Sequence, residues 1–172
     1  MQPLPLSPSV YAAIFAEAAQ AWPNEACGVI VGPLEAPEEQ RFVRFDNLQD
    51  RLHAADPEAH PRDARTAYAM DSLRLSRLLR EIESRGEVLI AVVHSHPQHP
   101  SYFSATDRAA ASSPFGGPTW PDAAQLVVSV YDREPRELRA FAWDGADWVE
   151  RSLGGLPPLP GPPPGARILG DV

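Results

Sequence analysis

The chain has 172 residues, of which 44% are hydrophobic, and a formal net charge of -8. This length and apolar content are typical of one globular domain and argue against wholesale disorder. The negative charge argues against a general nucleic-acid binder or a polybasic membrane-surface protein, because both need a basic face. We therefore expect neither nucleic acid nor a membrane as a partner.

The N-terminus and the cysteine content indicate the cellular compartment in which the protein is found. The stretch MQPLPLSPSVYAAIF lacks the charged start, apolar run and cleavage site of a secretion signal, and no later apolar run is long enough to span a bilayer. Cys27 is the only cysteine, so an intrachain disulfide is impossible. These features predict a cytoplasmic protein.

The first predicted element is a helix with the sequence VYAAIFAEAAQAW. Ser7 or Ser9 can cap its start, and Pro8 fits the first turn, where a missing N–H does no harm. Apolar residues recur at near-helical spacing, and Pro23 ends the element. We expect this helix to pack on the core.

Two short strands and a long loop are predicted next. Residues 26–31 are small or β-branched and stop at Gly32-Pro33, which is typical of a buried strand. Residues 41–45 alternate in polarity and indicate a half-buried strand. Between about residues 47 and 66 the periodicity is lost, which predicts a long surface loop of the kind that often contacts substrate.

A second helix and a central strand occupy the middle of the chain. Asp71 or Ser72 caps the helix, leucines and an isoleucine form its apolar stripe, and Arg85-Gly86 ends it. Residues 88–93 form a continuous apolar run, which predicts a strand buried on both faces.

The remaining elements are short. A helix is predicted near residues 104–111, followed by strands at 126–131, 138–143 and 147–151. Asp144-Gly145 joins the last two strands as a tight hairpin turn. After about Gly154 the chain is rich in Pro and Gly, which predicts an extended or disordered tail outside the core.

Together these elements predict a mixed α/β fold with one mainly antiparallel or mixed sheet flanked by helices. We assign residues 1–153 to this domain and residues 154–172 to the tail, without which the domain should still fold. We expect a monomer or a homodimer.

The sequence His94-Ser95-His96 directly follows the central strand. Residues two apart on a strand point to the same face, so both imidazoles can reach one point. A short turn can bring Asp107 to that point from the next helix. Two nitrogens and one carboxylate leave a tetrahedral zinc ion with one open position, which is the pattern of a catalytic site.

Each part of this cluster also has a plainer explanation. A lone His–x–His pair is usually structural or on the surface, and Ser104 with Asp107 fits a helix capping box, which is compatible with a role in the site. Cysteine is a residue type that can supply a fourth ligand, but the simpler interpretation of Cys27 is a small buried hydrophobic residue. His99 could compete as a ligand, although its place between Pro97 and Pro100 favours an exposed position or a contact with substrate. A Ser–His–Asp triad stays open, but no nucleophile elbow is present.

The segment HSHPQHPSYFSATD has the spacing His–x–His–x(7)–Ser–x(2)–Asp. It resembles the signature of the JAMM (MPN+) zinc metallopeptidase family. The upstream segment NEACGVIVG is similar to the family's Glu-x-Cys-Gly segment. The resemblance extends over residues 7–152 in element order and is specific in these two segments. It implies the cytidine-deaminase-like fold of that family, in its short prokaryotic single-domain form.

The resemblance also implies a role for each matching residue. His94, His96 and Asp107 would ligate one zinc ion per chain. Glu25 would take a proton from the attacking water and pass it to the leaving amine. Ser104 would donate a hydrogen bond to the oxyanion of the tetrahedral intermediate.

Members of this family cleave amide or isopeptide bonds after the C-terminal Gly-Gly of ubiquitin or ubiquitin-like proteins. The prokaryotic form implies a small β-grasp sulfur carrier as substrate, for example one of molybdopterin, thiamine or cysteine synthesis, released from a fusion or conjugate. One alternative is a non-catalytic MPN interaction module, which the presence of all five site residues disfavours. Another is an amidase that acts on a small aminoacyl or cysteinyl adduct.

Overall fold

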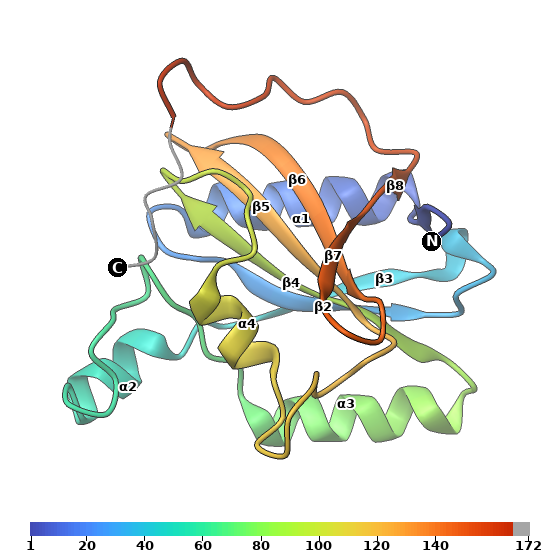
Figure 1. Ribbon diagram of the computed structural model, residues 1–172, viewed down its shortest axis with the longest axis horizontal. Helices are drawn as coiled ribbons and strands as arrows, with labels where there is room; N and C mark the ends of the chain where they lie inside the picture. The colour runs from blue at the N-terminus through green and yellow to red at the C-terminus, as the bar shows by residue number, and fades with distance from the viewer. Residues whose placement is uncertain (167–172) are drawn as a thin grey trace.

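The computed structural model describes residues 1–166 and contains a six-stranded sheet with helices on both faces (Figure 1). In sheet order the strands are β3 (Arg41–Phe45), β2 (Cys27–Gly32), β4 (Val88–Pro97), β5 (Ala124–Tyr131), β6 (Glu134–Trp143) and β7 (Trp148–Arg151). Neighbouring strands are antiparallel except β4 and β5, which are parallel. This mixed, mainly antiparallel sheet confirms the predicted fold class.

The helices are α1 (Pro8–Ala21), α2 (Gln49–Ala55), α3 (Ser72–Ser84) and α4 (Ala105–Ala111), with a 3-10 turn at Pro37–Glu39. Ser7, rather than Ser9, caps α1 by accepting a hydrogen bond from the Val10 N–H at 3.3 Å. Asp71 caps α3 in the same way. Within residues 1–166, no helix combines the length and the apolar character needed to cross a bilayer.

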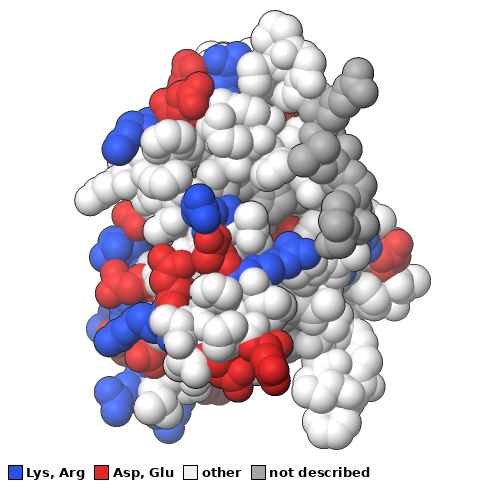
Figure 2. All heavy atoms as spheres, turned by 90° about the vertical axis from the view of Figure 1, so that its left-hand side faces the viewer, with Lys and Arg blue, Asp and Glu red and all other residues white. Residues whose placement is uncertain are grey.

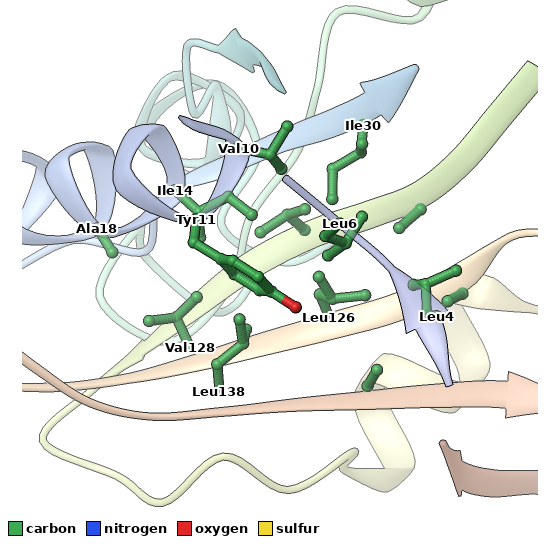
Figure 3. Packing of buried hydrophobic residues seen from close by; sticks show 14 of the residues in the cluster. Leu4, Leu6, Val10, Tyr11, Ile14, Ala18, Ile30, Leu126, Val128 and Leu138 are labelled. Carbon is green, nitrogen blue, oxygen red and sulfur yellow. The ribbon is translucent and has the colours of Figure 1, made fainter. Parts of the chain in front are cut away.

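Hydrophobic side chains are buried in clusters on both faces of the sheet. On one face, Val10 and Ile14 of α1 pack against Leu126 and Val128 of β5 (Figure 3). On the other face, Leu75 and Ile82 of α3 cluster with Val29 and Val31 of β2. Adjacent residues of the central strands therefore alternate between two cores, which explains why these strands have continuous apolar sequences.

Strand β4 is longer than predicted and is held on both edges. It pairs with β2 and β5, so that His94 lies opposite Cys27 on one side and Val127 on the other. His94 and His96 thus lie within the strand rather than after its end. Pairing on both edges at His94, and with β5 alone at His96, fixes the direction of the two imidazoles.

The prediction of a loop over residues 47–66 is wrong in its first part, which forms α2. This seven-residue helix has no side-chain cap. It is held by later residues: Gln49 donates to the Arg62 carbonyl at 2.8 Å, and Asp50 accepts from the Ala64 N–H at 2.8 Å. A helix that depends on contacts more than ten residues away has no local periodicity to reveal it.

Two short parallel strands, β1 (Leu4–Pro5) and β8 (Leu153–Gly154), were not predicted and bring the two ends of the domain together. Tyr11 donates a hydrogen bond to the Gly154 carbonyl at 2.7 Å. Beyond this point Leu156 and Leu159 pack against the core that contains α1. The expectation that the tail takes no part in a core is therefore wrong for these residues, because periodic patterns do not reveal two leucines spaced by prolines.

Residues 167–172 of the predicted tail lie outside the described residues. The boundary after residue 153 stays a prediction, and shortening the chain tests it. A chain ending at Gly154 loses the contacts of Leu156 and Leu159, and we expect its free energy of unfolding to fall by about 1–3 kcal/mol. Thermal and urea unfolding measure this loss.

A matched pair of full-length variants separates the leucines from the rest of the tail. Leu156→Ser with Leu159→Ser should reproduce the loss, whereas Pro157→Ser with Pro158→Ser should not, because both prolines are exposed. Equal melting temperatures for the wild type and the shortened chain would contradict this expectation.

Candidate metal centre

Two imidazole side chains converge from β4. His94 and His96 lie on the same side of the strand, and their Nε2 atoms are 3.1 Å apart. Both side chains are buried. The predicted convergence of these two residues therefore occurs in the fold, and the pairing of β4 with β2 up to His94 and with β5 beyond it maintains it.

Asp107 reaches the same point from α4. Its Oδ1 lies 3.3 Å from His94 Nε2, and its Oδ2 lies 3.4 Å from His96 Nε2. Ser104 fixes this carboxylate through a capping box: its N–H and its hydroxyl donate to Asp107 Oδ2 at 2.9 and 2.7 Å, and the Asp107 N–H donates back to Ser104 Oγ at 3.0 Å. The start of the helix and the carboxylate position are thus fixed by the same hydrogen bonds.

The three side chains fit a tetrahedral metal ion. Zinc with ligands at about 2.0–2.1 Å separates neighbouring ligand atoms by about 3.3 Å. The distances among the three side chains, 3.1, 3.3 and 3.4 Å, match the edges of such a site. Among the described residues, these are the three His, Cys, Asp or Glu side chains grouped closely enough to hold a metal ion.

A hydrogen bond of His96 supports this fit. Its Nδ1 lies 3.0 Å from the Pro100 carbonyl, which can only accept, so Nδ1 carries a proton, and in the neutral ring that a metal ligand needs Nε2 presents a lone pair to the cluster. That lone pair faces a second imidazole nitrogen and a carboxylate. Acceptor atoms so close together repel each other unless a cation lies between them.

The charges of the other two groups are also suited to metal binding. Burial lowers the pKa of His94, although the neighbouring Asp107 opposes this, so His94 is held neutral as a ligand requires. Burial acts to raise the pKa of Asp107, but the two neighbouring imidazoles outweigh it and lower that pKa. Asp107 therefore stays ionised.

Two tyrosines, both missed by sequence reasoning, contact the paired imidazoles. The Tyr68 ring stacks on His94 with centroids 4.8 Å apart, and Tyr102 makes an edge contact with His96 at 5.2 Å. His94 Nδ1 is buried without a hydrogen-bond partner among the described residues, so the stacked Tyr68 ring is the side-chain contact that faces this imidazole from outside the cluster. No pattern around either tyrosine indicates this role.

Glu25 lies beside the cluster, just before β2. Its backbone N–H donates to the Ala64 carbonyl at 2.7 Å, and Asn47 donates to its carbonyl at 3.0 Å. The side chain is 7% exposed and lines the same cavity of about 420 Å³ as His96 and Asp107. Burial raises the pKa of Glu25, and the charge of Asp107 adds to this effect, whereas Arg62 opposes it.

Two other candidates lie outside the three-residue group. Cys27 is buried and donates to the Phe45 carbonyl at 3.6 Å, and burial raises the pKa of its thiol to about 12. It therefore behaves as a small hydrophobe rather than a thiolate ligand. His99 lines the wall of the same cavity and is not part of the cluster.

Comparison with known proteins supplies a family context. The family model for prokaryotic homologs of the JAB domain matches residues 7–144. A CysO-cysteine peptidase of Mycobacterium tuberculosis is 32% identical over 129 residues, or 75% of each chain. A desampylase of Haloferax volcanii is 31% identical over 131 residues, which are 76% of this chain and 78% of the relative.

Solved structures share the fold. A protein from Desulfitobacterium hafniense matches with a TM-score of 0.62 and 22% identity, covering 87% of this chain and 90% of the other. A protein from Salinibacter ruber matches with a TM-score of 0.54 and 25% identity, covering 98% and 95%. These similarities agree with the mixed sheet and its flanking helices.

Replacing one clustered imidazole tests the metal site. We expect His94→Ala to lose the metal, because two remaining ligands cannot hold the ion tightly. His99→Ala is the control, since it removes an imidazole from the cavity wall but not from the cluster. Elemental analysis of the purified proteins measures the difference, and an unchanged metal content in His94→Ala would refute the ligand set.

A second prediction concerns the ring that stacks on His94. We expect Tyr68→Leu to weaken zinc binding by about 10-fold, the lower end of the effect of partners that orient metal ligands. Tyr68→Phe keeps the stacked ring and should bind zinc like the wild type. Competition with a chromogenic chelator measures both affinities, and wild-type affinity in Tyr68→Leu would show that the stacking does not orient His94.

Proposed function

The chain belongs to the family of prokaryotic homologs of the JAB domain, and on this premise we propose that it is a zinc-dependent peptidase. Its substrate would be a ubiquitin-like sulfur-carrier protein, cleaved after the C-terminal Gly-Gly. The observation that carries this proposal is the cluster of His94, His96 and Asp107 with Glu25 in the same cavity.

The proposed metal role follows from the donor set. When bound to two imidazoles and one carboxylate, zinc supplies Lewis-acid chemistry that polarises a carbonyl and acidifies water. His94 and His96 would hold it as neutral ligands and Asp107 as an anion. The Tyr68 and Tyr102 rings would keep the imidazoles oriented.

Glu25 is the proposed general base. A buried carboxylate with a raised pKa holds a proton more strongly than an exposed one. In the first step Glu25 would take a proton from the attacking water. In the second step it would give that proton to the nitrogen of the leaving amine, so that the carboxylate is restored.

Ser104 has two proposed tasks. Its hydroxyl donates to Asp107 Oδ2, and its backbone N–H donates to the same oxygen. The N–H contact would keep Asp107 in place while the hydroxyl rotates toward the oxyanion of the tetrahedral intermediate. Removing one such donor typically costs about 10²–10³ in turnover.

The substrate class rests on the two named relatives. One is named for a peptidase activity on CysO-cysteine, and the other is named a desampylase. From these two names we infer that this chain hydrolyses the amide bond that joins a carrier's C-terminal glycine to an amine. A non-catalytic interaction module is disfavoured, because such a module has no need of converging ligands or of a buried glutamate beside them.

The test is incubation of the zinc-loaded protein with Gly-Gly carrier fusions from the same genome, followed by intact mass. We expect cleavage after the second glycine by the wild type. Glu25→Gln should keep about one zinc per chain and slow cleavage by about 10²–10⁴, because the proton carrier is lost. Glu83→Gln, a change on the exposed face of α3, should cleave like the wild type.

Two results would contradict the proposal. Cleavage by Glu25→Gln at the wild-type rate would exclude it as the base. Failure of the zinc-loaded wild type on every carrier fusion would contradict the substrate class.

A further inference from the structure

Asn47 lies between β3 and α2, and its side chain makes four hydrogen bonds. Its Nδ2 donates to the Glu25 carbonyl and to the Ala67 carbonyl, each at 3.0 Å. Its Oδ1 accepts from the Gln49 N–H at 3.0 Å and from the Ala69 N–H at 3.1 Å. A primary amide has two N–H donors and two acceptor lone pairs, so every hydrogen-bonding position of this side chain is occupied.

All four partners of Asn47 are backbone groups, which settles the orientation of its amide. Carbonyl oxygens can only accept and peptide N–H groups can only donate, so the nitrogen and the oxygen of the side chain cannot exchange places. A fully satisfied polar group holds its partners rigidly. Asn47 therefore links three stretches of chain: the entry to β2, the start of α2 and residues 67–69.

Two of the four bonds lie on either side of Tyr68. Asn47 bonds the carbonyl of the preceding residue and the N–H of the following one, and the Leu48 N–H adds a bond to the Ala69 carbonyl at 2.9 Å. The segment that carries Tyr68 belongs to no helix or strand, so no regular hydrogen-bond pattern fixes its backbone. The bonds from Asn47 therefore set the direction in which the Tyr68 ring leaves the chain toward His94.

A third bond reaches the proposed base. The Glu25 carbonyl accepts from Asn47, and the Glu25 N–H donates to the Ala64 carbonyl at 2.7 Å. Both polar groups of this peptide backbone are thus held by the part of the chain that also carries Tyr68. The Glu25 side chain is buried and lines the same cavity as Tyr68, so a shift of its backbone would move the carboxylate relative to the metal cluster.

We propose that Asn47 is a positioning residue of the metal site. Through the peptides on either side of Tyr68 it holds the ring on His94, and through the Glu25 carbonyl it holds the proposed base in register with that ring. Asn47 borders a different hollow, of about 320 Å³, which Glu25 also lines, so it acts through these partners rather than on the reacting atoms. The inference rests on the proposed function, although its zinc-binding part is measured without substrate.

Asn47→Asp tests this role directly, because it replaces one NH2 group with oxygen and keeps the shape of the side chain. The carboxylate can still accept from the two N–H groups, but it cannot donate to the two carbonyls. We expect zinc affinity to fall by about 10-fold, as expected for Tyr68→Leu, because both changes act through the same ring. Competition with a chromogenic chelator measures the affinity.

The charge introduced by Asn47→Asp does not explain such a loss. A carboxylate added near the cluster would by itself favour binding of a cation. At longer range its effect is small, because acidic and basic side chains are already intermixed over the visible face on the side of α2 (Figure 2). A weaker zinc affinity in this variant therefore reports the two lost donors.

Gln49→Leu is the matched control. Gln49 is buried and donates to the Arg62 carbonyl at 2.8 Å, so it anchors the same segment at a point away from Tyr68. The change should lower the melting temperature, because a buried hydrogen bond is lost. It should leave zinc affinity at the wild-type value, because the Tyr68 ring keeps its two flanking bonds to Asn47.

Double variants show whether Asn47 acts through its two partners, because changes that act through one another give losses that do not add. In a protein that carries Tyr68→Leu, Asn47→Asp should weaken zinc binding no further. At saturating zinc, Asn47→Asp alone should slow cleavage of a Gly-Gly carrier fusion by about 10–100-fold, since a small misplacement of a reacting group has effects of this order. In the Glu25→Gln background it should slow cleavage no further.

The wild type offers a measurement that needs no variant. A local opening that frees the Ala69 N–H from Asn47 also releases the Tyr68 ring and so weakens zinc binding. By linkage, zinc makes this opening rarer by the same factor, so we expect zinc to slow hydrogen exchange of the Ala69 N–H by about 10-fold. Exchange of the Arg65 N–H, which is bonded to Asp63 Oδ1, should not change.

The outcomes separate this inference from the proposed function. Wild-type zinc affinity in Asn47→Asp, an equal loss in Gln49→Leu, or a full further loss on top of Tyr68→Leu would each overturn the inference. Further slowing in the Glu25→Gln background would overturn its second part. If Asn47→Asp does not fold, unchanged exchange of the Ala69 N–H in the wild type on zinc binding would overturn it. A wild type that binds zinc but cleaves no carrier fusion would contradict the proposed function, and the zinc affinities would still decide this inference.

Discussion

The central constraint in this protein is the pairing of β4 with a strand on each edge. Backbone hydrogen bonds to β2 and β5 fix the pleat, and the pleat directs His94 and His96 to one side with their Nε2 atoms 3.1 Å apart. Two hydrophobic cores, one on each face of the sheet, hold this strand in place. The position of the imidazoles therefore depends on the stability of the sheet.

The position of Asp107, the proposed third ligand, is specified in another way. Asp107 lies in the first turn of α4, where the Ser104 capping box both starts the helix and fixes the carboxylate. In most helices a capping box serves only folding. Here the same three hydrogen bonds orient a group that faces two imidazoles, so local helix geometry and metal-site geometry are coupled.

The cavity combines groups from parts of the chain that are far apart in sequence. Glu25 precedes β2, Tyr68 precedes α3, and Arg62 follows α2. Charges meet around the buried Glu25: Asp107 acts to raise the pKa of Glu25, and Arg62 acts to lower it. In such surroundings electrostatic effects are stronger than in water, which gives each charged side chain influence on the chemistry.

Periodicity and local capping are enough to predict the sheet-forming runs, helices α1, α3 and α4, and the spacing that lets His94, His96 and Asp107 meet. The remaining parts depend on the fold as a whole: helix α2, the β1–β8 pair, and the placing of Tyr68 and Arg62 at the cavity. Each of these depends on contacts between residues distant in sequence, such as Gln49 with the Arg62 carbonyl or the Tyr68 ring with His94. No local pattern encodes such contacts, since their free energy arises only after the chain has folded.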